Sequence, residues 1–120
     1  MIEFEEYKGK LNGLKPTLDS LREALHLESA EKEIEELEGQ SARDGFWNDV
    51  EKSQRVQKRL KQLKSKVENY QKLCSGWDDL MTLCEMAIEE DDDSMLPELQ
   101  GEYAEFEKKL EETRLGTLLT

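Results

Sequence analysis

The chain has 120 residues and a mass of 14.0 kDa, which corresponds to a single domain. Lys and Arg number 17 against 29 Asp and Glu, so the formal net charge of −12 argues against non-specific binding to nucleic acid or to an anionic membrane. No apolar run approaches the roughly 20 residues of a transmembrane helix, and the first ten residues do not resemble a signal peptide. We therefore expect an acidic protein of the cytoplasm.

The first half of the chain predicts two helices. Apolar residues spaced three and four apart run from Phe4 to Leu25 and keep their phase through Pro16, so we expect one kinked helix rather than two. A second helix is predicted over residues 29–38, with Ser29 as its N-terminal cap. The polar, glycine-flanked segment 39–45 is predicted to be a connection.

The second half predicts one long helix and one shorter helix. A stripe of apolar residues from Val56 to Ile88 predicts a helix over residues 50–89, which is roughly 60 Å long at 1.5 Å per residue. The segment 75–78 could instead be a capping box that starts a new helix, but the unbroken heptad phase across Gly76 favours one helix. The acidic run 89–93 ends this helix, and a fourth helix is expected to start at Ser94, with Pro97 in its first turn.

These elements predict the fold class and a domain boundary. We expect an all-α fold, an antiparallel helical bundle or coiled coil of about four helices with one very long central helix. Residues 115–120 show no helical stripe and end on apolar residues. We therefore expect a helical domain over residues 1–114, followed at 115–120 by the start of a linker within a longer protein.

Side chains for catalysis or metal binding are sparse. Cys74 and Cys84 would lie about 15 Å apart along one helix, too far to form a disulfide, and are expected to be reduced thiols. The single histidine, His26, is interpreted as a partly exposed linker residue. No glycine-rich phosphate loop is present, so the sequence predicts no enzyme and no catalytic, cofactor-binding or metal site.

Basic residues are concentrated in one segment of this acidic chain. Between residues 49 and 72 there are eight bases against three acids, whereas the predicted second helix is rich in glutamate. The favoured interpretation is that the two helices pair their charges. The alternative is a surface that contacts RNA or an acidic protein, for which the candidates are Lys58, Arg59, Lys61 and Lys64.

Two adjacent aromatic residues precede the long helix. We expect Phe46 and Trp47 to form a hydrophobic plug that closes one end of the bundle, with the indole N–H bonded to a nearby carbonyl. The alternative is an exposed anchor for a partner, which is less favoured because two exposed aromatics would form a costly apolar patch.

A family resemblance rests on short segments spread over essentially the whole chain. In order, they are Gly45-Phe46-Trp47-Asn48-Asp49, Gln54, Lys58, Asp79-Leu80, Met86-Ala87, Glu89-Glu90-Asp91-Asp92, Leu110-Glu111 and Arg114-Leu115-Gly116-Thr117-Leu118-Leu119. Together they resemble the N-terminal domain of bacterial peptide chain release factor 2. The Phe-Trp pair before the long helix fits this family better than its paralogue, release factor 1.

The resemblance implies a factor that acts in translation termination at UGA and UAA codons. It also implies limits, because the family's codon-reading Ser-Pro-Phe tripeptide and its catalytic Gly-Gly-Gln loop do not occur in these residues, and Glu38-Gly39-Gln40 lacks the second glycine. The implied role is to dock at the stalk base of the large ribosomal subunit, on its RNA and protein, and to influence the GTPase release factor 3, without decoding or hydrolysis. The alternative from the residues alone is a generic acidic coiled-coil adaptor.

Overall fold

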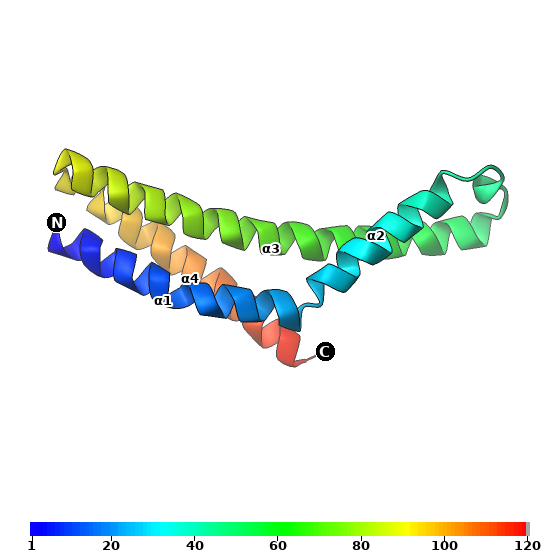
Figure 1. Cartoon of the computed structure of the whole chain (residues 1–120), viewed down its shortest axis with the longest axis horizontal. Coiled ribbons are helices and arrows are strands. Elements are labelled where there is room, and N and C mark those ends of the chain that lie inside the picture. The colour runs from blue at the N-terminus through cyan, green and yellow to red at the C-terminus, as the bar shows by residue number, and fades with distance from the viewer. Residues whose placement is uncertain (120) are drawn as a thin grey trace. The chain divides into compact units, whose positions relative to one another are not determined.

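The computed structural model describes residues 1–119, and within that range the chain is helical with no strand (Figure 1). Its four α-helices are α1 (Ile2–Ala24), α2 (Leu27–Ser41), α3 (Val50–Glu90) and α4 (Leu96–Leu118). Two short 3₁₀ turns, η1 (Phe46–Asn48) and η2 (Asp93–Met95), precede α3 and α4. The predicted all-α class with one very long helix is confirmed. None of these helices combines the length and apolarity needed to cross a bilayer.

The constant phase of the apolar stripes correctly predicted that two helices continue without a break. Helix α1 runs through Pro16 without ending, and α3 runs through Gly76, so the capping-box alternative at residues 75–78 is wrong. Because each added residue of a helix gains a backbone hydrogen bond, a stripe that stays in phase favours propagation over a break.

The helix ends differ from the prediction at four places. One is the start of α4, which lies at Leu96 rather than at Ser94 because Ser94 belongs to the preceding turn η2. Helix α2 begins at Leu27, so Ser29 lies inside it, and the capping position is taken by His26 in a left-handed conformation with φ 55°. The same helix continues past residue 38 to Ser41, so the first three residues of the expected connection, 39–41, are helical. Helix α4 passes Arg114 and reaches Leu118, although residues 115–118 bury little apolar surface. Propagation from an established helix accounts for both extensions.

The chain divides into two compact units, and each has its own apolar core. The three-helix unit comprises residues 1–21 and the chain from residue 71 onward. In it, the Trp77 indole N–H donates a hydrogen bond to the Leu11 carbonyl, and the rings of Tyr7 and Tyr103 meet edge-on with centroids 5.1 Å apart. Helix α3 packs here against two helices, which explains why its apolar stripe widens after residue 72. The largest fully buried side chains of this unit are Phe4, Leu11, Leu99 and Cys84.

The hairpin unit comprises residues 22–70 and contains α2, η1 and the first half of α3. Helix α2 (cyan in Figure 1) and the beginning of α3 (green) are joined by residues 42–49, which we call the hairpin tip. Its buried core near the tip consists of Phe46, Val56 and Leu60, packed against Ile34 and Leu37. Because only one helix covers this part of α3, most of its remaining surface is exposed and carries the basic residues.

Candidate functional site

Ion pairs join the two helices of the hairpin unit. Arg59 donates to both carboxylate oxygens of Glu33, at 2.7 Å from Nε and 3.0 Å from Nη2. Lys64 Nζ lies 3.7 Å from the Glu38 carboxylate. Two of the four candidate contact residues therefore have an intramolecular role, because they pair with glutamates of α2.

The Arg59–Glu33 pair also favours the ionised form of both groups. The hydrogen bond from Arg59 lowers the pKa of the Glu33 carboxyl, and the same bond raises the pKa of the Arg59 guanidinium. Both side chains are thus fully ionised at neutral pH and largely neutralise each other. Neither offers a net charge to a distant partner.

The other two candidates, Lys58 and Lys61, remain available. Both are exposed, and no carboxylate among the described residues lies within ion-pair distance of either ammonium group. Arg55 is exposed and unpaired in the same way, and it precedes Lys58 by three residues, so the three side chains share one face of α3. We call Arg55, Lys58 and Lys61 the basic row. The i, i+3 spacing was the signal in the sequence that could have added Arg55 to the candidates.

The two aromatic residues of the tip have opposite environments. Gly45, with φ 83°, starts the turn η1, in which Phe46 is buried while the side chain of Trp47 is 61% exposed. The expected plug is therefore correct for Phe46 and wrong for Trp47. A 3₁₀ turn has three residues per turn, so consecutive side chains point about 120° apart and only one of them can enter a two-helix interface.

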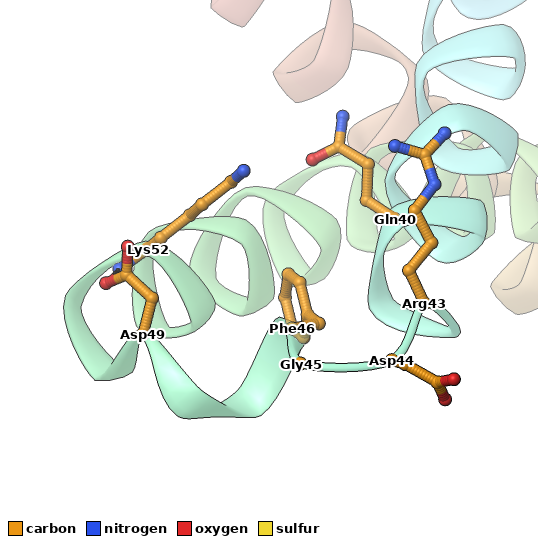
Figure 2. A pocket seen from close by; sticks show the side chains of 7 residues that line it. All are labelled: Gln40, Arg43, Asp44, Gly45, Phe46, Asp49 and Lys52. Carbon is orange, nitrogen blue, oxygen red and sulfur yellow. Dashed lines mark hydrogen bonds between the residues drawn. The ribbon is translucent and has the colours of Figure 1, made fainter.

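A small open pocket of about 250 Å³ lies at the tip (Figure 2). Figure 2 shows Gln40 of α2 and Arg43 of the tip on one side of Phe46. Asp49, the last residue of the tip, and Lys52 of α3 lie on the other. The Asp49 carboxylate accepts a hydrogen bond of 3.1 Å from the backbone N–H of Lys52 and so caps α3. The pocket lining contains charged and amide groups around one aromatic ring, and none of the lining residues is a Ser, Thr, Cys or His nucleophile or base.

The thiols and the imidazole are not assembled into a reactive site. Cys84 is buried, and burial raises the pKa of its thiol, which makes it a poor nucleophile. Cys74 is half-buried and lies ten residues before Cys84 on α3. His26 is exposed in the connection between α1 and α2. Within residues 1–119, no three His, Cys, Asp or Glu side chains converge in a way that would hold a metal ion.

Comparison with known proteins assigns the chain to a domain family. The profile of the PCRF domain matches residues 30–120, which is most of the sequence. The chain belongs to the PCRF domain family. Peptide chain release factor 2 of Clostridium perfringens (strain SM101) is 32% identical to it over 120 residues, which cover 100% of the chain and 33% of that protein. The corresponding protein of Staphylococcus epidermidis is 34% identical over 118 residues, covering 98% of the chain and 32% of the relative.

The PCRF domain assignment agrees with the resemblance seen in the sequence. Release factor 2 of Petrotoga mobilis, 29% identical over 120 residues, extends the same result to a third organism. No solved structure matches the chain. This PCRF domain spans about a third of the length of the curated relatives it matches. An accidental likeness between acidic coiled coils does not account for matches over the whole chain, so the generic-adaptor alternative is not supported.

Proposed function

We propose that this PCRF domain is the part of a release factor that docks it on the large ribosomal subunit during termination at UGA and UAA codons. The contact is with RNA and protein at the stalk base, and through it the domain influences release factor 3 in the cytoplasm. The chain itself neither reads the codon nor hydrolyses peptidyl-tRNA. Support comes from its relatives, which are named peptide chain release factor 2, and from the absence of Ser-Pro-Phe and Gly-Gly-Gln sequences in the 120 residues.

The observation that carries the docking proposal is the basic row. The whole chain has a net charge of −12, yet Arg55, Lys58 and Lys61 present three cations on one exposed helix face with no intramolecular partner among the described residues. Screening limits electrostatic effects to roughly 8–10 Å at physiological salt, so the distant acidic residues do not cancel this local field at contact. A phosphate backbone is the partner that such a row suits best.

The test compares two matched double variants for binding to purified large ribosomal subunits. Reversing Lys58→Glu and Lys61→Glu should weaken binding and lower the salt dependence by about one counterion per lysine, with little change in thermal stability. Reversing Arg59→Glu and Lys64→Glu should instead lower the melting temperature, because each new glutamate faces an existing one across the hairpin.

The outcomes separate docking from a purely structural role. Unchanged subunit binding by the Lys58→Glu/Lys61→Glu variant would reject the basic row as the contact. Any stop-codon-dependent release of peptide by the purified chain would reject the statement that it does not hydrolyse. Both measurements use the folded chain, whose helix content is checked by circular dichroism.

A further inference from the structure

The most exposed large aromatic side chain of the described residues lies at the hairpin tip. Trp47 is 61% exposed, and Val50, three residues on, is 60% exposed. An indole held in water at the end of a hairpin costs solvation free energy without contributing to the core. Its exposure is therefore informative about what meets the tip.

The local structure holds the indole in place. The Phe46 and Trp47 rings pack at 90° with centroids 4.9 Å apart, and Phe46 is itself anchored in the hairpin core. The turn beneath them is closed by the Asn48 N–H, which donates to the Gly45 carbonyl at 3.1 Å, and is followed directly by the Asp49 cap of α3. Little side-chain entropy thus remains to be lost when a partner binds this indole.

The segment that contains the indole carries its excess of positive charge along the start of α3, whereas the tip itself has Arg43 against Asp44 and Asp49. Residues 42–61 contain six Lys and Arg against three Asp and Glu, a net charge of +3 in a chain of −12. Counting Arg59 as neutralised by Glu33 still leaves a net charge of +2. Arg43 and Lys52 line the pocket beside Phe46, together with the carboxylates of Asp44 and Asp49 (Figure 2). The basic row begins one turn further along α3.

These features favour one class of occupant. An apolar protein groove would satisfy the indole but not the cations along the start of α3, and a second copy of the chain, meeting tip to tip, would bring two such basic helix starts together. Unpaired RNA supplies both a flat base and phosphates, and aromatic side chains beside Arg and Lys are the usual means of binding it. The tip and the start of α3 together supply an exposed indole for stacking and cations for adjoining phosphates.

We propose that Trp47 stacks on an unpaired base of RNA while Arg43 and Lys52 contact the adjoining phosphates. The proposal deepens the docking function above and rests on it for the source of the RNA. It makes a separate commitment, however: the tip selects single-stranded or looped RNA over a continuous duplex, because a base inside a helix offers no open face.

The test uses two fluorescently labelled RNA probes, a stem with an unpaired purine loop and a fully paired duplex of the same length, and large ribosomal subunits alongside them. Replacing Trp47→Ala or Trp47→Leu should weaken binding to the looped probe about tenfold, whereas Trp47→Tyr should retain most of it. Binding to the duplex should change little. Leu115→Ala, another exposed apolar residue, is the matched control and should leave both affinities unchanged.

A direct sign of stacking is also available. The looped probe should quench the emission of exposed Trp47 and leave that of buried Trp77, so quenching should vanish in the Trp47→Tyr variant even though it still binds. Absence of quenching in the unmodified chain would overturn the proposal, as would equal binding by the Trp47→Ala variant. Retention of subunit binding by Trp47→Leu but not Trp47→Ala would also overturn it, since the indole would then meet an apolar protein surface.

Failure of the docking function gives a different pattern. If the chain does not bind subunits but shows the loop preference and the quenching, the docking function fails and the stacking platform stands. If subunit binding depends on Lys58 and Lys61 but not on Trp47, the docking function stands and the stacking platform fails.

Discussion

The guanidinium of Arg59 donates two hydrogen bonds to the carboxylate of Glu33 across the hairpin, with Nε–Oε2 and Nη2–Oε1 distances of 2.7 and 3.0 Å. A two-point hydrogen bond between planar groups fixes direction as well as distance. Because the pair is exposed, it contributes more to the register of α2 against α3 than to stability. It also neutralises one of the two arginines of the segment 49–72 and so removes its charge from the surface available to a partner.

The pH dependence of this pair is predictable in sign. The pKa of Glu33 is lowered in the folded chain, so its contribution to stability is present near neutral pH and is lost as the pH falls through the acidic range, below about 4.3. Glu33→Gln should therefore lower the melting temperature slightly at pH 7, and the difference from the unmodified chain should shrink by pH 3. Thermal unfolding followed by circular dichroism at both pH values checks this. A difference that persists at pH 3 would contradict it.

Trp77 should matter for stability where Trp47 does not. Trp77→Phe keeps an aromatic ring in the three-helix unit but loses the hydrogen bond to the Leu11 carbonyl and weakens the contact with Lys15, whose ammonium lies 4.6 Å from the ring centroid. We expect a loss of about 1–2 kcal/mol in the free energy of unfolding, measured by urea denaturation. The matched variant Trp47→Phe should stay within about 0.5 kcal/mol. Equal losses for both variants would refute the distinction.

Gly45 should tolerate no side chain without strain. Its φ of 83° lies in the left-handed region, and it opens the turn that positions Phe46. Gly45→Ala should cost about 1–2 kcal/mol in the free energy of unfolding. Gly45→Asn should cost less, because asparagine adopts this conformation more readily. If the alanine variant unfolds at the same urea concentration as the unmodified chain, the turn is not under this constraint.

Gly101 should respond in the opposite way. It lies inside α4, is exposed, and a Cβ built there meets nothing within 4 Å. Gly101→Ala should therefore stabilise the chain by about 0.5–1 kcal/mol by reducing the entropy lost on helix formation. A rise in the melting temperature without a change in helix content is the expected result. A fall would show that the position is packed against a surface.

Much of the fold was predictable because it depends on local periodicity. The heptad phase identified α3 as a single helix through Gly76, and the stripe through Pro16 identified α1 as one helix. The helix ends were less predictable. His26 in a left-handed conformation starts α2 earlier than Ser29, and no side-chain pattern in the sequence marks that choice.

The candidate site, like the fold, could be predicted from the sequence only in part. The excess of bases in the segment 49–72 is a property of the sequence alone, and so is the lack of catalytic and codon-reading motifs. The separation of Arg59 and Lys64, which pair with glutamates, from Lys58 and Lys61, which do not, was not evident there.

The sequence by itself determined the all-helical class, the long helix and the family, since each depends on residue spacing or identity along the chain. Only the tertiary structure decided which bases are neutralised and that Phe46 is buried while Trp47 is exposed. The physical reason is the rotation of α3 about its own axis. The packing of Phe46, Val56 and Leu60 against Ile34 and Leu37 sets how α3 is turned toward α2, and that rotation assigns each neighbouring side chain either to the interface or to water.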